Sequence, residues 1–334
     1  MLSQISNYQM PAFERLFKHL EPIHLLTATG AVTVSYFSLK VLGFIYQYFL
    51  KPSTLYRYQA VKSPKGEAPW ALITGSSDGI GKALAIELAS KGFNIVIHGR
   101  TPSKLAKAAS DLETEYKIKT RILALDACDY TLDLDKPVSE VLGDTKITIL
   151  VNNVGGISTA AKRVYDTLAD RTGEEVDRLF SLNGRFATQL TRIIIPRMTE
   201  PGIIINVSSS SSFGLPWVQL YSGGKGFINS LSIALNTEMY ATGRDIKVMA
   251  VTPGSVAGTP GFVYASGSYL PDTKTIAKAI LNRMGSEWPV LSPWWFQAIQ
   301  ELVFVWTPPT MYKKLTANIL RDMKGIEDRQ LEQS

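Results

Sequence analysis

A glycine-rich turn that directly follows a short apolar run constrains the fold of this chain more than any other feature. The apolar run is Trp70–Ile73, and Thr74 leads into glycines at Gly75, Gly79 and Gly81. Glycine permits a tight turn and a close approach of the backbone to a ligand, and the free N–H groups at the start of a following helix favour an anion. The pattern therefore predicts a strand, a phosphate-binding turn and a helix.

Further apolar runs of strand length recur along the chain, and helical patterns fill the gaps between them. The runs lie at Trp70–Thr74, Asn94–His98, Arg121–Leu125, Thr148–Asn152, Ile203–Val207 and Lys247–Val251. Alternation of strands with helices is typical of a parallel sheet covered on both faces. We therefore predict an α/β fold, a Rossmann-type doubly wound parallel sheet with helices on both faces.

Composition and charge limit the class of protein. With 334 residues, 45% of them hydrophobic, the chain is long enough for one large α/β domain and extensions. The net charge is +6, but Lys and Arg are scattered, so we expect an anionic cofactor or an anionic membrane surface and no nucleic acid. The single cysteine, Cys128, excludes an internal disulfide and favours a reducing compartment. We expect no metal site.

The first part of the chain predicts a membrane anchor. Pro11–Leu20 has the spacing of a short amphipathic helix, Leu25–Leu39 carries no charge, and the apolar pattern continues to Leu50. About 20 apolar residues span the hydrocarbon core of a bilayer. The alternatives are an amphipathic helix that packs on the domain and one that lies on the bilayer. Lys and Arg residues after the segment weakly favour a cytosolic catalytic domain.

A tyrosine and a lysine far downstream are spaced for carbonyl chemistry. Tyr221 and Lys225 are four residues apart, so they share one helical face. A free phenol has a pKa near 10, and we expect the Lys225 ammonium to lower the pKa of Tyr221. Such a pair can donate a proton to a carbonyl oxygen while a nicotinamide supplies a hydride.

Several motifs in register with this pair resemble the short-chain dehydrogenase/reductase family. They are the turn Gly75–Gly81, Asn152–Gly155, Asn206–Ser209 and Thr252–Val256, and the similarity extends over about Trp70–Val256. The valine of Asn152-Asn153-Val154-Gly155 is typical of the family's membrane-anchored very-long-chain 3-oxoacyl-CoA reductases and related 17β-hydroxysteroid dehydrogenases. In general layout the chain is closest to that subgroup.

The resemblance implies a set of catalytic residues. The implied residues are Asn183, Ser209, Tyr221 and Lys225, where the serine hydrogen-bonds the substrate carbonyl and the asparagine holds a water that links the lysine to solvent. The family usually leaves twelve residues between serine and tyrosine, a spacing that fits Ser208. The motif itself favours Ser209. The five-serine run therefore leaves Ser208, Ser209 and Ser210 open, with Ser209 preferred.

The resemblance also implies the cofactor residues. An acidic residue after the second strand favours NAD, whereas an arginine favours the 2′-phosphate of NADP(H). Here the residue is Arg100, with Lys104 one turn on, so we predict NADP(H); the alternative is a surface arginine without a ligand. The expected cofactor-binding residues are Gly75, Ser77, Asp78, Gly79, Ile80, Gly81, Arg100, Lys104, Asp126, Asn153, Gly155, Tyr221, Lys225, Pro253, Gly254 and Val256.

Together these patterns divide the chain and suggest an activity. We expect an anchor and linker at 1–66, with Ser63–Glu67 as the linker, a catalytic domain at 67–256, and a substrate lid or membrane-associated tail at 257–334. The predicted activity is NADPH-dependent reduction of a lipidic ketone, a 3-oxoacyl-CoA above all, at the endoplasmic reticulum membrane. The alternatives are a 17β-hydroxysteroid or secondary-metabolite ketone dehydrogenase and a non-catalytic nucleotide-binding scaffold. The oligomeric state is open between a monomer and a homodimer.

Overall fold

The computed structural model describes residues 22–61, 66–259 and 270–333 of the chain. The chain divides into two compact units, Met1–Lys51 and Pro52–Ser334. The amphipathic helix expected at Pro11–Leu20 and most of the linker expected at Ser63–Glu67 lie outside the described residues.

The described part of the first unit is one long apolar helix. Helix α2 (Pro22–Ile45) continues into a π-helical turn, η1 (Tyr46–Leu50), and an 18-residue window within these 29 residues has a mean hydropathy of 1.4. None of the described residues of α2 is buried. Its three threonine hydroxyls donate to carbonyls four residues earlier, which satisfies them within the helix. By length and composition this helix can span a membrane.

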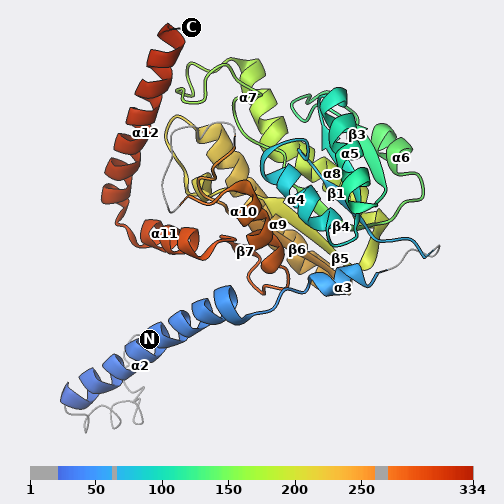
Figure 1. The fold of residues 1–334 in the computed structure, drawn as a ribbon. Coiled ribbons are helices and arrows are strands. Elements are labelled where there is room, and N and C mark those ends of the chain that lie inside the picture. The colour runs from blue at the N-terminus through green and yellow to red at the C-terminus, as the bar shows by residue number, and fades with distance from the viewer. Residues whose placement is uncertain (1–21, 62–65, 260–269, 334) are drawn as a thin grey trace, which may run out of the picture. The chain divides into compact units, whose positions relative to one another are not determined.

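The second unit is built on a parallel sheet of seven strands in the order β3-β2-β1-β4-β5-β6-β7 (Figure 1). The strands are β1 (Trp70–Ile73), β2 (Asn94–Gly99), β3 (Thr120–Ala124), β4 (Ile147–Asn152), β5 (Met198–Val207), β6 (Ile246–Val251) and β7 (Val290–Leu291). All six apolar runs correspond to strands, which confirms the predicted fold class. The two-residue β7 is too short to leave a sequence pattern.

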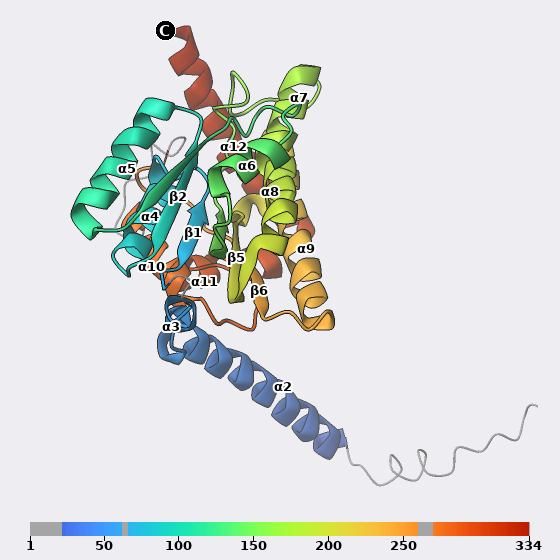
Figure 2. The ribbon, with the colours of Figure 1, turned by 90° about the vertical axis from the view of Figure 1, so that its right-hand side faces the viewer.

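Helices cover both faces of this sheet (Figure 2). On one face lie α4 (Gly79–Ala89), α5 (Pro102–Tyr116) and α10 (Thr273–Asn282); on the other lie α6 (Asp135–Leu142), α7 (Gly173–Phe180), α8 (Phe186–Ile194) and α9 (Gln219–Ala241). Ala71 and Ile73 of β1 pack in the first layer, whereas Leu72 packs in the second. The strands are therefore buried on both sides, which explains their continuous apolar runs.

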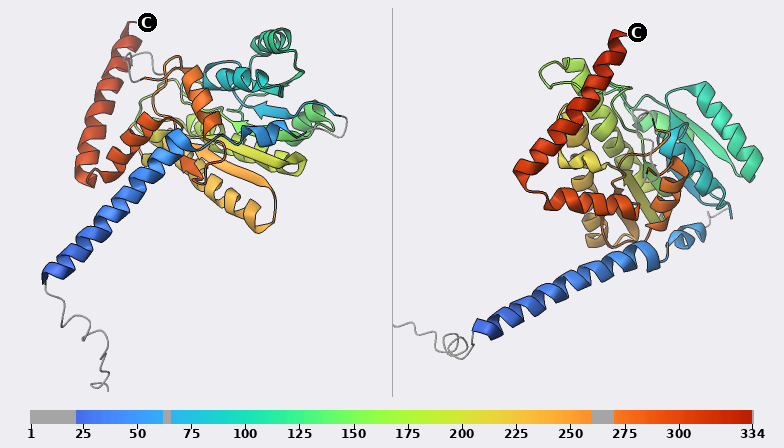
Figure 3. Two further views of the ribbon diagram at one scale, coloured as in Figure 1. Left: turned by 60° about the horizontal axis from the view of Figure 1, so that its bottom comes forward. Right: turned by 60° about the vertical axis from the view of Figure 1, so that its left-hand side comes forward.

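The remaining elements are short turns and a C-terminal pair of helices. A short helix, α3 (Leu55–Gln59), precedes the sheet, and the turns are η2 (Ser181–Arg185), η3 (Ile195–Arg197) and η4 (Ser210–Phe213). Helix α11 (Trp295–Trp306) leads through Pro308 into α12 (Pro309–Glu332), and the two run in different directions (Figure 3). Residues beyond 256 thus add α10, β7, α11 and α12 to the same unit as the sheet.

Candidate active site

The predicted site residues gather at the carboxyl edge of the sheet. Strand β1 lies between β2 and β4, so the chain connections reverse direction there, and in open α/β sheets ligands bind at such a switch point. Each of five strands is followed by predicted residues: Gly75–Gly81 after β1, Arg100 after β2, Asp126 after β3, Asn153 and Gly155 after β4, and Pro253–Val256 after β6.

The glycine positions of the turn require glycine, either for the sign of φ or for lack of space. Gly75 and Gly79 have φ values of +65° and +57°, and a Cβ on Gly81 would lie 2.2 Å from the Gly75 carbonyl oxygen. Asp78 caps helix α4, and its Oδ1 accepts a hydrogen bond of 2.7 Å from the Gly79 N–H. Ser77 and Ile80 complete the turn. Backbone N–H groups at a helix start, with bare glycines around them, fit a pyrophosphate.

Two side chains that the sequence analysis did not single out, those of Thr74 and His98, hold this turn. Thr74 Oγ1 accepts from the N–H groups of Asn153 and Val154 at 2.8 and 2.9 Å, and Asn153 Nδ2 donates to the Thr74 carbonyl at 2.9 Å. Buried His98 accepts from the Gly75 N–H through Nδ1 at 3.2 Å. Thr259 lies on the open side, where a Cβ on Gly79 would be 4.0 Å from its methyl group. In the sequence, only the position of Thr74 directly before the glycine motif could have indicated such a supporting residue.

The end of strand β2 and the start of α5 carry positive charge. Arg100 directly follows β2 and is exposed, and Lys104 is exposed in the first turn of α5. A Cβ on Gly99 would lie 3.3 Å from Ser77 Oγ, so the glycine turn adjoins the end of β2. Asp126 follows β3 and accepts from the Cys128 N–H at 2.9 Å. Because Arg100 is exposed, a phosphate could approach its guanidinium directly from solvent.

The predicted acid–base pair lies on one face of α9. Lys225 is 4% exposed, its Nζ is 5.6 Å from the centre of the Tyr221 ring, and Nζ donates to the Val207 carbonyl at 2.8 Å. Burial lowers the pKa of Lys225 to about 8, so the side chain is mostly an ammonium at neutral pH.

The pKa of Tyr221 differs from our expectation. Burial raises this pKa and the Ser209 hydroxyl opposes the shift, whereas we expected the Lys225 ammonium to lower it. Loss of solvation disfavours the phenolate more than its neighbours favour it. The phenol therefore stays protonated at neutral pH, which suits a proton donor.

The three candidate serines have different surroundings. Ser208 is 3% exposed, and its hydroxyl donates to the Lys225 backbone carbonyl at 2.9 Å. Ser209 accepts from the Ser211 N–H at 3.1 Å, and its hydroxyl is the one that acts on the pKa of Tyr221. Ser210 begins η4, and its N–H donates to the Pro253 carbonyl at 3.1 Å. Of the three, Ser209 has its hydroxyl beside the phenol.

Asn183 and Gly155 lie against the lysine. Asn183 is in the π-helical turn η2, and π turns are frequent at functional sites. Its side chain accepts from the Gly156 N–H at 2.9 Å and donates to the Gly156 carbonyl at 2.8 Å. A Cβ on Gly155 would lie 2.7 Å from Lys225 Nζ and 3.1 Å from Asn183 Oδ1. A side chain at position 155 would therefore displace the ammonium.

The segment after β6 lies between the serine loop and helix α11. Val256 is 2% exposed in the core, and its carbonyl accepts from Thr259 Oγ1 at 2.8 Å. The Pro253 carbonyl bonds to the serine loop, and the Gly254 N–H donates to Gln297 of α11 at 3.0 Å. The segment thus adjoins both the serine loop and helix α11.

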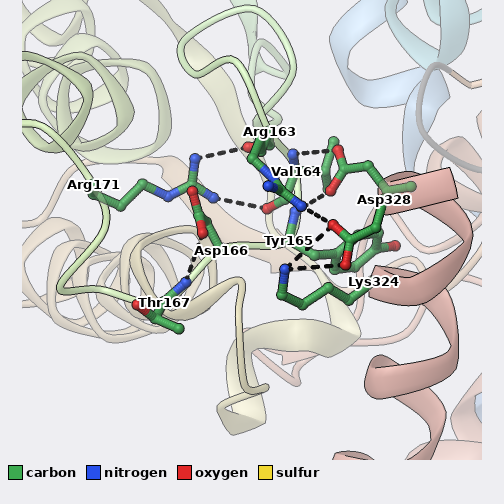
Figure 4. Close-up of polar contacts among 9 residues, drawn as sticks. Arg163, Val164, Tyr165, Asp166, Thr167, Arg171, Lys324 and Asp328 are labelled. Carbon is green, nitrogen blue, oxygen red and sulfur yellow. Dashed lines mark hydrogen bonds and ion pairs between the residues drawn. The ribbon is translucent and has the colours of Figure 1, made fainter. Parts of the chain in front are cut away.

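Helix α12 is attached to the chain that leads from β4 to α7 (Figure 4). The Glu327 carboxylate accepts from the N–H groups of Val164 and Tyr165 at 2.7 and 2.9 Å, and Arg163 forms an ion pair with Asp328. From the opposite side, Arg171 donates to the carbonyls of Arg163 and Val164 at 2.7 and 2.9 Å. The backbone of residues 163–165 is therefore held from two directions.

This attachment reaches the chain just before helix α9, which carries Tyr221 and Lys225. The Asp166 N–H donates to the Trp217 carbonyl at 3.0 Å, four residues before Tyr221. Leu320 of α12 packs in a small cluster with Tyr165 and Val218, and Tyr221 contacts the same cluster. Helix α12 therefore supports one wall beside the phenol.

Comparisons with known proteins identify the family of this chain. The family model described as short chain dehydrogenase matches residues 69–265. Relatives named very-long-chain 3-oxoacyl-CoA reductase include one from Scheffersomyces stipitis, 28% identical with 91% of this chain and 90% of the relative covered. Another, from Candida albicans, is 30% identical, with 81% and 79% covered. Reductase-B from Danio rerio is 30% identical, with 77% and 81% covered.

Solved structures show the same fold. A short-chain dehydrogenase from Sphingobium yanoikuyae in complex with NADPH is 28% identical, with a TM-score of 0.58, 67% of this chain and 87% of that chain covered. A bulky-bulky ketone specific alcohol dehydrogenase from Comamonas testosteroni is 27% identical, with a TM-score of 0.56, 72% and 95% covered. Because the family model matches more than half of the chain, this protein belongs to the short-chain dehydrogenase family.

Proposed function

We propose that this protein is a membrane-anchored reductase that uses NADPH to reduce the 3-ketone of a long-chain 3-oxoacyl-CoA to a hydroxyl. The observation that carries the proposal is the grouping of Tyr221, Ser209 and Lys225 on the sheet edge that also bears the glycine turn. The names of relatives that match most of the chain support this substrate class.

The chain supplies the acid and the orientation for this reaction. The nicotinamide of the cofactor would, when bound, supply the hydride for the carbonyl carbon. The Tyr221 hydroxyl donates its proton to the carbonyl oxygen, and the Ser209 hydroxyl donates a hydrogen bond to the same oxygen. The Lys225 ammonium stabilises the phenolate that remains, because its pKa of about 8 keeps it charged at neutral pH.

The preference for NADPH rests on charge at the adenosine end. Arg100 and Lys104 are exposed where the family's fold presents the adenosine ribose, and a guanidinium suits a phosphate. The glycine cradle at Gly75–Gly81 would hold the pyrophosphate, and Pro253–Val256 would face the nicotinamide.

The membrane would deliver the substrate. Helix α2 is of spanning length, and α11 exposes large apolar side chains on the second unit: Trp295, Ile299, Leu302, Val303, Val305 and Trp306. Exposed apolar helix faces with tryptophans suit the membrane interface. We infer that α2 spans the endoplasmic reticulum membrane, that α11 rests on its cytosolic surface, and that a lipidic substrate reaches Tyr221 from the bilayer.

The test is a substrate panel with the full chain in detergent or membranes. NADPH oxidation would be followed with 3-oxoacyl-CoAs of increasing chain length, ketosteroids and small ketones, and repeated with NADH. The proposal predicts the highest kcat/KM for long 3-oxoacyl-CoAs with NADPH. A preference for ketosteroids, or for NADH, would contradict the substrate or the cofactor assignment, and bound nucleotide without turnover of any ketone would indicate a scaffold.

A further inference from the structure

Helix α11 has two chemically different faces. One face carries the exposed apolar side chains described above, whereas the opposite face is buried and carries an amide. Gln297 is only 3% exposed, and its neighbour Ala298 is 8% exposed. A buried polar side chain is stable only with hydrogen-bond partners, so its partners indicate its role.

Both ends of the Gln297 amide bond to one backbone segment. Oε1 accepts from the Gly254 N–H at 3.0 Å, and Nε2 donates to the Ser255 carbonyl at 2.9 Å. The amide also packs closely against Gly254, since a Cβ there would be 3.2 Å from Nε2 and 3.3 Å from Cδ. Gln297 therefore fixes the position and the orientation of the Gly254–Ser255 backbone, in the way that a neighbouring strand would.

This contact completes a continuous pairing between two stretches of chain. Residues Ala250 and Val251 of β6 pair with β7, and the Thr252 N–H donates to the Leu291 carbonyl at 3.0 Å. Beyond Thr252 the backbone ladder ends, and Gln297 takes over at Gly254 and Ser255. The side chain thus extends the sheet's support past the end of the strand.

One helical turn further on, Glu301 also turns toward this segment. Burial raises the pKa of Glu301 to about 7, and the Thr252 hydroxyl opposes the shift. The polar face of α11 therefore faces residues 252–255, and Gln297 is the residue of this face whose amide oxygen and nitrogen both form hydrogen bonds with the segment.

The other side of the segment contacts the catalytic loop. The Ser208 N–H donates to the Val251 carbonyl at 2.8 Å, and the Ser210 N–H donates to the Pro253 carbonyl at 3.1 Å. Residues 253–255 are therefore held between the serine loop and α11. A shift on the α11 side would move the surface that faces the nicotinamide relative to Ser209.

We propose that Gln297 is a positioning residue, which sets the Pro253–Ser255 segment against the nicotinamide ring and so governs hydride transfer. This inference rests on the reductase activity proposed above. The two hydrogen bonds of the Gln297 amide go to Gly254 and Ser255 rather than to the glycine turn or Arg100, so the adenosine half of the cofactor would keep its contacts without them. The expected signature of a change at Gln297 is slow chemistry with nearly unchanged cofactor affinity.

Two variants separate the functions of the amide. Gln297→Met keeps the length of the side chain and removes both hydrogen bonds. Gln297→Glu keeps the acceptor for Gly254 but places an oxygen against the Ser255 carbonyl. A misplacement of about 1 Å can cost about 100-fold in rate. We therefore expect kcat to fall about 10- to 100-fold in both, with little change in the KM for the acyl-CoA or in the Kd for NADPH.

The measurements use the full chain with NADPH carrying deuterium at the transferred position. The variants should show a larger isotope effect on kcat, because hydride transfer becomes slower than the other steps. They should also show weaker fluorescence of the bound reduced nicotinamide, a readout of ring immobilisation that needs no substrate. Gln300→Met is the matched control, since Gln300 is exposed on the same helix and should change nothing.

The outcomes distinguish this inference from the proposed function. The comparison is made with whichever ketone the wild type reduces best, so a substrate other than a 3-oxoacyl-CoA contradicts only the proposed function. Unchanged kcat, isotope effect and fluorescence in folded Gln297→Met would overturn the positioning role. So would a rise in the Kd for NADPH as large as the fall in kcat, because that pattern indicates general loss of the site.

Discussion

The buried histidine beneath the glycine turn gives the unit a defined sensitivity to acid. His98 is 1% exposed, its Nδ1 accepts from the Gly75 N–H, and its ring stacks on Phe186 with 4.8 Å between centroids. Burial lowers the pKa of His98 to about 4, against the opposing influence of Asp126 and the Leu125 backbone. An Nδ1 that accepts a hydrogen bond requires the neutral ring.

The size and sign of the effect follow from this pKa. In the unfolded chain His98 is protonated as the pH falls through about 6.5, whereas in the folded chain it stays neutral until the pH falls to about 4. Unfolded chains therefore hold more protons in this window, and the free energy of unfolding falls as the pH falls. At about 1.36 kcal/mol per pKa unit, the loss is about 2 kcal/mol by pH 5 and about 3 kcal/mol in full.

The matched variant is His98→Asn, whose amide oxygen can accept from Gly75 but cannot titrate. Urea unfolding of both full-length proteins in detergent would be followed by tryptophan fluorescence from pH 7.5 to pH 5. The stability of the wild type relative to the variant should fall by about 2 kcal/mol across this range. Other groups, such as Glu301 with its pKa raised to about 7, cancel in the difference. Parallel pH curves for the two proteins would refute the reasoning.

Three further predictions test separate parts of the account. Arg100→Ala should weaken NADPH binding about 10- to 100-fold, because it removes a phosphate contact of about 1.5–3 kcal/mol, and should leave NADH binding nearly unchanged. Lys107→Ala, further along the exposed face of α5, is the control. Equal weakening of NADPH and NADH in a binding titration would contradict the role of Arg100. Glu327→Gln should raise the KM for long acyl-CoAs without changing the Kd for NADPH, because the variant loses one of the two backbone contacts of Glu327 and these are made at Val164 and Tyr165, not at the glycine turn. Asp322→Asn, on the exposed side of α12, is the control and should have no effect. An unchanged KM for long acyl-CoAs in Glu327→Gln would contradict the idea that α12 supports a wall of the substrate site. Alkaline carbonate should leave the full chain in the membrane fraction, and its release into the supernatant would exclude a spanning α2.

The sheet could be predicted because its strands are buried on both faces. Continuous apolar runs such as Asn94–Gly99 and Ile147–Asn152 appear in the sequence without any knowledge of their partners. The glycine turn was equally readable, since backbone at Gly75 and Gly81 excludes other residues. By contrast, β7 has two residues and gains its conformation only from pairing with β6.

The supporting residues could not be predicted because each depends on a distant partner. Gln297 and Gly254 are 43 residues apart, and Glu327 and Val164 are 163 apart. Nothing local distinguishes these side chains from ordinary helix residues. His98 lies within an apolar strand, where a satisfied core histidine is the usual interpretation. The direction of the Tyr221 pKa was also wrong from sequence, because spacing reveals the neighbouring lysine but not the loss of solvent.

The central claim is that Tyr221 donates the proton when this protein reduces a 3-oxoacyl-CoA. The most direct measurement is conversion of a long-chain 3-oxoacyl-CoA to the 3-hydroxy product at saturating NADPH, with the Kd for NADPH measured alongside. Tyr221→Phe should lower turnover at least ~10²-fold and leave the Kd nearly unchanged, because only the acid is removed. Tyr240→Phe, on the same helix and 87% exposed, should behave as the wild type. Near-normal turnover by Tyr221→Phe would contradict the account.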